Sequence, residues 1–174
     1  MTQYEKVVFL DSDMQIVRNI DDLFERPHMS AVIADQFDEP GLEKLNSGLI
    51  VIEPNHEEFV GLSTLAKDFY HREHVGDQDV IRAYYSEWFG GGIIPPSHNI
   101  LYDQCNSKRG NIRKEDVTPV SVIHYIGKKK PWMMTIRAIY RRTKNNFLGR
   151  YIVAYYLSWQ WKILQMKIKR LSAK

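Results

Sequence analysis

Val7-Val8-Phe9-Leu10 runs directly into Asp11-Ser12-Asp13, and this stretch decides the fold. The apolar run predicts a buried, central β-strand that carries two carboxylates at its exposed end. Because side chains alternate between the faces of a strand, Asp11 and Asp13 point the same way and can share one cation. Carboxylates held this close repel each other unless a cation or a proton relieves them. The stretch therefore predicts a metal site at a strand end.

A second string far downstream complements the first: His124-Tyr125-Ile126-Gly127-Lys128-Lys129-Lys130-Pro131-Trp132. It follows a predicted strand at 120–123. His124 offers a third metal ligand, Gly127 permits close approach of the backbone to a ligand, and Lys130 can reach diphosphate oxygens. Carboxylates suit Mg²⁺ or Mn²⁺, and an added imidazole favours Mn²⁺. A packed histidine beside a solvated basic run is the plainer alternative, but the combination predicts a metal–diphosphate site.

The remaining pattern alternates short apolar runs with helical spacing. Strands are predicted at 31–34 and 49–52, separated by a polar loop at 36–44, and helices are predicted over 55–70 and from Gly76 onward. Strands that alternate with helices predict an α/β domain with a largely parallel sheet. A chain of 174 residues with 44% hydrophobic content can bury the core of one such domain.

Charge is divided unevenly along the chain. The segment up to Asp116 holds 11 of the 24 basic residues and all 21 acidic ones, so the last segment is basic without a single carboxylate side chain. Such asymmetry predicts an anionic partner for the C-terminal region. Within that region, residues 151–161 are almost wholly apolar and aromatic, and residues 162–174 are basic.

This C-terminal pattern predicts an interfacial helix over residues 151–174. The apolar part is shorter than the roughly 20 residues that a membrane-spanning helix needs. Trp159 and Trp161 would lie at headgroup depth, with lysines facing anionic lipid. Nucleic-acid binding and a helix packed on the domain are the alternatives. Lipid is favoured because the basic residues lie beside Trp, Tyr, Ile and Leu, so no nucleic-acid partner is expected.

The compartment is predicted from two further features. The single cysteine, Cys105, cannot form an intrachain disulfide, which suits a reducing compartment. The N-terminal residues show no basic segment followed by a long apolar core, so no signal peptide is visible. We therefore expect a cytoplasmic protein, peripheral on the inner face of the membrane through its C-terminal helix.

Two polar motifs offer groups that suit a sugar: Asn46-Ser47-Gly48 and Gly76-Asp77-Gln78. Each one alone is readily explained as local loop chemistry, with Asn and Gly in a turn and Asp near a helix start. Together, Asn46, Asp77 and Gln78 provide neutral and charged hydrogen-bonding groups for hydroxyls.

The order and spacing of these motifs resemble glycosyltransferase family 8, which includes glycogenin and bacterial lipopolysaccharide glucosyl- and galactosyltransferases. The resemblance covers residues 4–132 and implies an α/β, GT-A (Rossmann-like, nucleotide-diphospho-sugar transferase) fold. It further implies a partial catalytic domain over 1–132 and a basic, aromatic helical tail over 133–174. The matching residues are Phe9 to Asp13, Asn19 to Phe24, Asn46 to Gly48, Gly76 to Gln78, Asn99, and His124 to Trp132.

The resemblance also implies the chemistry: a retaining transferase that moves a hexose from a UDP-sugar to a glycan or lipid-linked acceptor with Mn²⁺ or Mg²⁺. By position, Asp11, Asp13 and His124 would bind the metal, and Gly127 and Lys130 would hold the diphosphate. Retention by same-face attack and by double displacement both remain open.

For the donor sugar, the resemblance implies Asn46, Asp77 and Gln78 as contacts. Gln78 would lie on the face where a nucleophile is expected, so Gln78 and Asp77 are the catalytic candidates. One departure from the family pattern is His74, at a position where glycogenin-like members have an acidic residue. It predicts a different sugar preference, and glucose, galactose and N-acetylglucosamine all remain open.

A second departure is the length before the first motif. Family members carry a β-α-β region there, which supplies the uracil and ribose pocket, whereas this chain starts four residues before its own strand, predicted over residues 5–10. We therefore expect a GT-A domain that is incomplete at its N-terminus, with an exposed sheet edge and apolar faces. The alternative function is that of a truncated, non-catalytic fragment that binds metal or membrane.

A rival enzyme class is the haloacid-dehalogenase-like phosphatase, which also places Asp-x-Asp after an apolar strand. That class usually has Thr, Val or Gly soon after the second Asp, whereas Met14 and Gln15 follow here. Its late Gly-Asp motif should follow an apolar strand, but the polar residues 70–74 precede Gly76. The phosphatase interpretation is therefore disfavoured.

Overall fold

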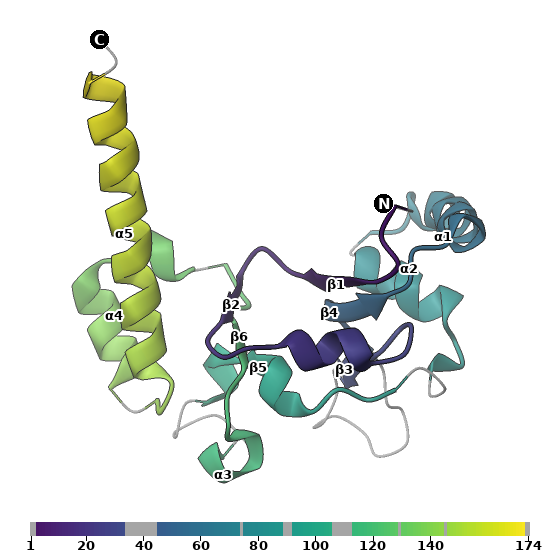
Figure 1. Cartoon of the computed structure of the whole chain (residues 1–174), viewed down its shortest axis with the longest axis horizontal. Coiled ribbons are helices and arrows are strands. Elements are labelled where there is room, and N and C mark those ends of the chain that lie inside the picture. Colours follow the sequence, from purple (N-terminus) through teal and green to yellow (C-terminus); the bar gives the residue numbers. More distant parts are fainter. Residues whose placement is uncertain are drawn as a thin grey trace. The chain divides into compact units, whose positions relative to one another are not determined.

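The computed structural model describes residues 3–33, 45–73, 75–88, 92–105, 113–128, 130–144 and 146–172. These residues divide into two compact units. The first unit comprises Met1–Ser12 and Arg18–Asn99, and the second comprises Asp13–Val17 and Ile100–Lys174. Each unit contains a three-stranded sheet of its own (Figure 1).

In the first unit, the sheet has the order β1-β4-β3 and is antiparallel throughout, with β1 at Val7–Leu10, β4 at Leu45–Ile52 and β3 at Ala31–Ile33. The strand predicted around residues 7–10 is confirmed, but its predicted central place is wrong. β4 takes the centre because it pairs with β1 through residues 49–52 and with β3 on its other side, and its eight residues are mostly buried. Among the described strands β1 lies at the edge, and Phe9 is 39% exposed.

Two helices of the first unit agree with the prediction. Helix α1 spans His56–Phe69, and the Asn55 side chain caps it by accepting hydrogen bonds from the N–H groups of Glu57 (2.8 Å) and Glu58 (3.2 Å). Helix α2 spans Asp77–Tyr84. Neither helix contains a fully buried residue, so the predicted apolar face of α1 is only partly covered. Short 3₁₀ turns lie at Asp21–Glu25 and Pro96–His98.

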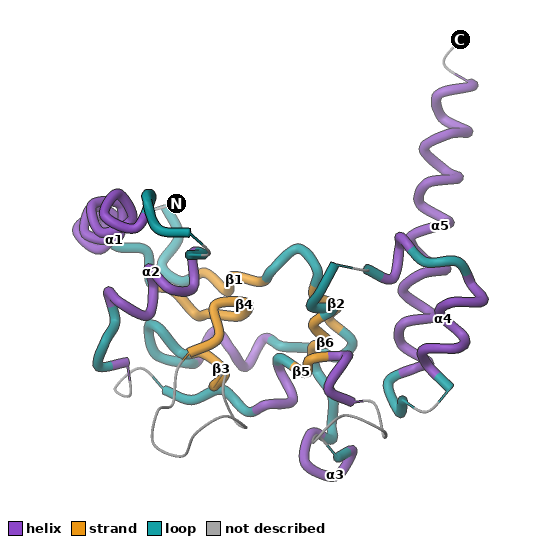
Figure 2. Tube along the Cα trace, turned by 180° about the vertical axis from the view of Figure 1, so that it is seen from behind, coloured by secondary structure: helices purple, strands orange, loops and turns teal. Residues whose placement is uncertain are grey.

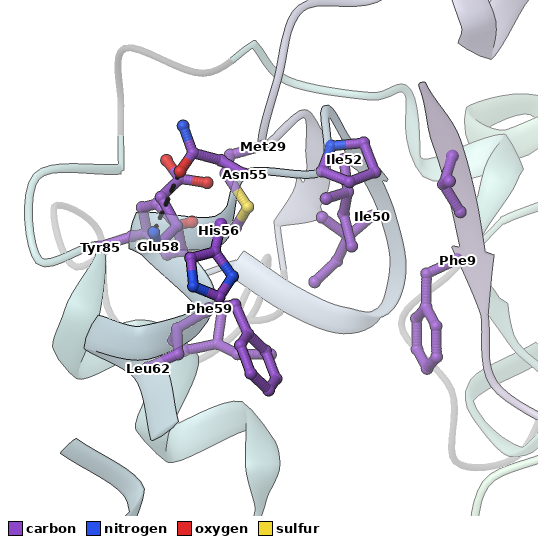
Figure 3. Close-up of a pocket in the computed structure, with 13 residues that line it drawn as sticks. Phe9, Met29, Ile50, Ile52, Asn55, His56, Glu58, Phe59, Leu62 and Tyr85 are labelled. Carbon is purple, nitrogen blue, oxygen red and sulfur yellow. Dashed lines mark hydrogen bonds between the residues drawn. The ribbon is translucent and has the colours of Figure 1, made fainter. Parts of the chain in front are cut away.

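An apolar pocket of about 480 Å³ opens in the first unit (Figure 3). The cross-strand neighbours Val7 and Ile52, and Phe9 and Ile50, line it from β1 and β4. Apolar and aromatic residues of α1, α2 and the residue after α2 line the other side: Phe59, Leu62, Ile81 and Tyr85. In the described part of this unit, apolar side chains of the sheet and of both helices thus face a pocket rather than a filled core.

The second unit has a smaller sheet of order β2-β6-β5, with β2 at Met14–Ile16, β6 at Val122–His124 and β5 at Ile100–Leu101. Its helices are α3 (Lys114–Val117), α4 (Ile136–Thr143) and α5 (Gly149–Ser172), and α4 packs beside α5 (Figure 2). Short 3₁₀ turns lie at Tyr102–Cys105 and Pro131–Met133. The buried core joins sheet and helices through Ile100, Ile123, Ile139, Leu148 and Ile152.

The predicted largely parallel sheet is wrong for the described strands. β1/β4, β3/β4 and β2/β6 are antiparallel, whereas β5/β6 is parallel, with one further parallel bridge between Ala31 and Ile93. A parallel pair needs a long crossover, usually a helix, and the sequence predicts only a polar loop between β3 and β4. Ala34 and the loop at 36–44 lie outside the described residues.

The C-terminal helix of the prediction is confirmed as α5, although it begins within the core of the second unit. Leu148 and Ile152 are fully buried, whereas Leu157, Trp161 and Leu164 are about half exposed. No described helix, α5 included, is both long enough and apolar enough to cross a membrane.

Candidate functional site

Asp13 and His124 come together through strand pairing in the second unit. Asp13 directly precedes β2, His124 ends β6, and the antiparallel register sets Met14 opposite His124. The N–H of Tyr125 continues the pairing by donating to the Asp13 carbonyl at 3.0 Å. As a result, His124 Nε2 lies 3.2 Å from Asp13 Oδ1, with side-chain exposures of only 7% and 16%. The arrangement presents a carboxylate and an imidazole to a single point.

Lys130 is held against the same carboxylate. Its ammonium donates to Asp13 Oδ2 and, at 2.8 Å, to the carbonyl oxygen of Tyr125. Pro131 follows as the first residue of a 3₁₀ turn, a position that proline favours because its φ angle is already fixed there. The Asp13 carboxylate therefore contacts both His124 and Lys130, so three of the residues predicted for a metal–diphosphate site lie together.

Gly127 occupies the turn between His124 and Lys130 with φ +90°, a left-handed conformation that L side chains rarely adopt. An added Cβ would be in ordinary contact with Asp103 Oδ2, at 3.8 Å. Asp103 in turn forms an ion pair with Arg142 of α4. Backbone conformation, rather than lack of space, therefore explains the glycine.

Asp11 belongs to the first unit, where its N–H donates to the Gly48 carbonyl at 2.8 Å and extends the pairing of β1 with β4. Asp11 is only two residues before Asp13. Chain connectivity alone therefore limits their Cα atoms to a separation of about 7 Å.

The asparagine motif lies inside strand β4, not in a turn as its composition suggests. Asn46 Oδ1 accepts a hydrogen bond from Asn99 Nδ2 at 2.8 Å and another from the Gly48 N–H at 2.9 Å. Asn99 is part of the family resemblance but received no predicted role. The structure identifies Asn99 as the residue that orients the Asn46 amide.

The glutamine motif lies at the start of α2 and contacts the same strand. Gln78 Oε1 accepts a hydrogen bond from the Ser47 N–H at 3.0 Å, and Arg82 Nε donates to the Leu45 carbonyl at 2.9 Å. Asp77 is exposed, and its carboxylate accepts from the Gln78 N–H at 2.9 Å. The predicted sugar contacts Asn46 and Gln78 therefore lie in one network in the first unit, with Asp77 beside Gln78. His74 lies outside the described residues.

Both groups of residues lie within a segment that matches a known protein family. The profile of glycosyl transferase family 8 matches residues 1–135. The chain belongs to glycosyltransferase family 8. This assignment confirms the resemblance seen in the sequence and sets aside the dehalogenase-like alternative.

Two relatives illustrate how the family 8 chain matches larger proteins. Glycogenin-1 of Mus musculus is 33% identical over 139 residues, covering 78% of this chain and 40% of the relative. Putative UDP-glucuronate:xylan alpha-glucuronosyltransferase 3 of Arabidopsis thaliana is 32% identical over 140 residues, covering 76% of this chain and 21% of the relative. The chain thus spans two-fifths of the first relative and one-fifth of the second.

Solved structures of other glycosyltransferases share the fold of this family 8 chain. The galactosyltransferase LgtC, in complex with donor and acceptor sugar analogs, matches with a TM-score of 0.59 at 18% identity, over 89% of this chain and 62% of that one. The glycosyltransferase GlyE of Streptococcus pneumoniae TIGR4 matches with 0.59 at 19% identity, over 90% and 44%. The predicted GT-A fold is confirmed.

Tyr125 is a residue of the family 8 motif for which the sequence predicted no role. It is 2% exposed and joins three parts of the site: its N–H bonds Asp13, its carbonyl accepts from Lys130, and its hydroxyl donates to Gln15 Oε1 at 2.6 Å. Burial raises the pKa of the Tyr125 phenol above its usual value. Its position next to His124 on a buried strand was the available signal.

Proposed function

We propose that this chain takes part in the transfer of a hexose from a UDP-sugar to a glycan or lipid-linked acceptor, with retention at the anomeric carbon. The main support is the Asp13 carboxylate, which lies between the imidazole of His124 and the ammonium of Lys130. A lysine ammonium and two potential cation ligands at one point suit a reaction in which a diphosphate leaves with growing negative charge.

For the cation, we propose that Asp11, Asp13 and His124 are the ligands. The donor set fits Mn²⁺ or Mg²⁺, because carboxylate oxygens suit both ions and a neutral imidazole favours Mn²⁺. His124 Nε2 and Asp13 Oδ1 already face each other across 3.2 Å, so both ligand atoms are available at one point. When bound, the cation would supply Lewis-acid stabilisation of the leaving UDP.

Lys130 and Gly127 are the proposed diphosphate contacts. The Lys130 ammonium is anchored on the Tyr125 carbonyl and shares the Asp13 carboxylate. We expect Lys130 to exchange Asp13 for a diphosphate oxygen on donor binding, because a charge-assisted bond to phosphate is strong and Asp13 then serves the cation. Gly127, which adopts φ +90°, lets the backbone of this turn approach the phosphates.

The donor sugar is proposed to bind Asn46, Asp77 and Gln78. The Asn46 amide is oriented by Asn99, and the Gln78 amide is held by the Ser47 N–H, so both side chains are fixed before a sugar arrives. Fixed amides select hydroxyl positions without a cost of reorganisation. Gln78 and Asp77 remain the catalytic candidates, and glucose, galactose and N-acetylglucosamine are the donors to test.

Calorimetry of UDP binding to the purified chain tests the proposal, with Mn²⁺ present and with a chelator. We expect binding that requires Mn²⁺ and is lost in Asp13→Ala. UDP binding of equal strength in chelator, or equal binding by the variant, would contradict the proposed cation site. A chain that binds Mn²⁺ and UDP but fails to transfer from any of the three UDP-sugars would instead support the binding-only function.

We further propose that α5 contacts an anionic membrane surface at the cytoplasmic face, which would suit a lipid-linked acceptor. Four apolar residues recur at helical spacing and are 47–60% exposed: Leu157, Trp161, Leu164 and Ile168. Lysines on the same helix are exposed: Lys162, Lys167 and Lys169. Apolar surface together with positive charge favours anionic lipid.

Vesicle sedimentation tests the membrane contact. We expect the chain to sediment with anionic phosphatidylglycerol vesicles more than with neutral phosphatidylcholine vesicles, and Trp161→Ser to reduce that fraction. The matched control is Met133→Ser, because Met133 is an exposed apolar residue of the same unit outside α5. Equal loss in both variants, or no preference for anionic vesicles, would contradict the contact.

A further inference from the structure

An aromatic cluster joins α5 to the loop that carries the proposed metal and diphosphate contacts. The ring of Tyr155, on α5, stacks on the ring of Tyr125 with centroids 5.6 Å apart and planes 7° from parallel. Trp132, just after Lys130, meets the edge of Tyr155 at 5.9 Å and 76°. All of these residues belong to the second unit. The helix thus contacts both ends of the segment that runs from His124 to Trp132.

The Tyr125 ring that Tyr155 covers is attached to the backbone that holds the site. The Tyr125 N–H donates to the Asp13 carbonyl at 3.0 Å, and the Tyr125 carbonyl accepts from Lys130 Nζ at 2.8 Å. A second ring, Tyr102, packs against Tyr125 at 5.3 Å. Rotation or withdrawal of the Tyr125 ring would therefore disturb the backbone atoms that orient Lys130 and Asp13.

Tyr155 itself lies within electrostatic range of the proposed ligand. The pKa of its phenol is raised, first by burial and then by the negative charge of Asp13. Tyr155 is only partly buried, so its ring forms a wall of the cluster and not a part of the innermost core. Stacked aromatic rings have a preferred geometry, which makes such a wall a stiff support.

We propose that Tyr155 is a positioning residue of the metal–diphosphate site, acting through its ring stack on Tyr125 to keep His124 and Lys130 directed at Asp13. The inference rests on the proposed function. It makes α5 a structural part of the donor site, although the sequence places this helix in a tail outside the catalytic residues.

The test compares Tyr155→Ala, Tyr155→Phe and Tyr156→Ala in the full chain. Tyr156 is the matched control, because it is also partly buried against the same core but projects from α5 about 100° away from Tyr155. The first readout is the Mn²⁺ dissociation constant by calorimetry, with the melting temperature recorded for each variant. We expect Tyr155→Ala to weaken Mn²⁺ binding about 10-fold, the scale seen when a residue that orients a ligand is lost.

Rescue by phenylalanine separates positioning from general destabilisation. Tyr155→Phe keeps the stack, so it should bind Mn²⁺ like the wild type. Tyr156→Ala should lower the melting temperature without weakening Mn²⁺ binding. Wild-type affinity in Tyr155→Ala, equal weakening in Tyr156→Ala, or failure of Tyr155→Phe to restore binding would each overturn the proposed ring-stack role.

A ligand-free readout distinguishes this inference from the proposed function. The side-chain nuclear magnetic resonance signals of His124 report its contact with Asp13 without any cation. They should shift in Tyr155→Ala and stay in place in Tyr155→Phe and Tyr156→Ala. A wild-type chain that binds neither Mn²⁺ nor UDP would contradict the proposed function alone, whereas unshifted His124 signals in Tyr155→Ala would overturn the positioning role whatever the chain binds.

Discussion

The two compact units hold their polar groups by different chemistry. In the second unit, the Asp13 carboxylate forms an ion pair with Lys130 and contacts the imidazole of His124, so charged groups fix the geometry. In the first unit, neutral amides fix each other: Asn46 accepts from Asn99, and Gln78 accepts from a backbone N–H. The comparison teaches that the proposed diphosphate half should respond to cations and pH, and the proposed sugar half to shape and hydrogen-bond geometry.

The hydrophobic cores of the two units also differ, because that of the second unit buries more ionisable groups. The core of the second unit buries ionisable groups, namely Tyr102, Cys105 and Tyr125, and burial raises the pKa of each, that of Cys105 to about 12. The core cluster of the first unit consists of Met29, Ala31, Leu45, Ile50 and Trp88, with Tyr85 packed at its margin. Burial also raises the pKa of Tyr85, but three such groups lie in the second unit, so changes of charge should affect the second unit more.

The largest expected effect is on Mn²⁺-dependent UDP binding, for which Asp13 of the second unit is a proposed ligand. Asp13→Asn keeps the shape of the side chain but removes its charge. Losing a residue that only orients a metal ligand weakens metal binding roughly 10- to 100-fold. Because Asp13 is a proposed ligand itself, we expect Mn²⁺-dependent UDP binding to weaken by more than that. Calorimetry measures this. Glu115→Gln is the control, because it removes an exposed carboxylate from the same unit. Tight binding by Asp13→Asn would contradict a charge-based site.

The next effect is an alkaline loss of stability that is larger in the second unit than in the first. The buried thiol of Cys105 has a pKa raised from 9.0 to about 12, and the phenols of Tyr102 and Tyr125 are raised in the same direction. A raised pKa adds stability that is fully present below the unfolded value and is lost as pH climbs toward the folded one. We therefore expect the free energy of unfolding to fall between about pH 9 and pH 12.

Hydrogen exchange as a function of pH, compared after correction for the intrinsic exchange rate, measures which unit opens. Backbone amides of β6 and α5 should lose protection before those of β4. Near-ultraviolet absorbance of tyrosinate should rise with the same transition, because the buried phenols ionise only when the second unit opens. Loss of protection in β4 at a lower pH than in β6 would contradict the assignment of charge sensitivity to the second unit.

A smaller effect is expected from Gln78→Ala in the first unit. The variant leaves the Ser47 N–H without its 3.0 Å acceptor, which costs about 1 kcal/mol of stability in chemical denaturation. Donor-sugar transfer should fall while Mn²⁺-dependent UDP binding stays at the wild-type level. Gln78→Glu is the control, because its carboxylate oxygen still accepts from Ser47. Weaker UDP binding in Gln78→Ala would contradict the proposal that the diphosphate contacts and the sugar contacts act separately.

The sequence was informative where chemistry is local. The two motifs predicted one metal–diphosphate site, and the structure brings Asp13, His124 and Lys130 together, although the role of each residue stays a prediction. Helical spacing from Asn55 onward predicted α1, which Asn55 caps. Pairing partners are not local. The apolar run at Val7–Leu10 looked central, yet the longer β4 is the strand that pairs on both sides.

Contacts between aromatic residues that are distant in the sequence could not be predicted either. Residues 151–161 contain several aromatic side chains, and no pattern in the sequence distinguishes Tyr155, which stacks on Tyr125, from its neighbours. The interfacial helix was predicted from composition, which does not reveal that its first turns are buried in a core. Turn chemistry was the simpler alternative for the asparagine motif, because Asn and Gly favour turns. In the structure, pairing of Asn46 with Val32 and the hydrogen bond from Asp11 to Gly48 keep the motif extended within β4.

The last expected effect is on stability alone and concerns the backbone turn between His124 and Lys130. Gly127→Ala places a Cβ in ordinary van der Waals contact with Asp103 at 3.8 Å, without a clash, but forces alanine to φ +90°. A left-handed conformation costs an L residue roughly 1–2 kcal/mol, which chemical denaturation should detect as lost stability. Gly127→Asn should recover part of the loss, because asparagine adopts positive φ more readily. If alanine were as stable as glycine, the turn between His124 and Lys130 would not depend on this conformation, and its proposed approach to the diphosphate would lose its structural basis.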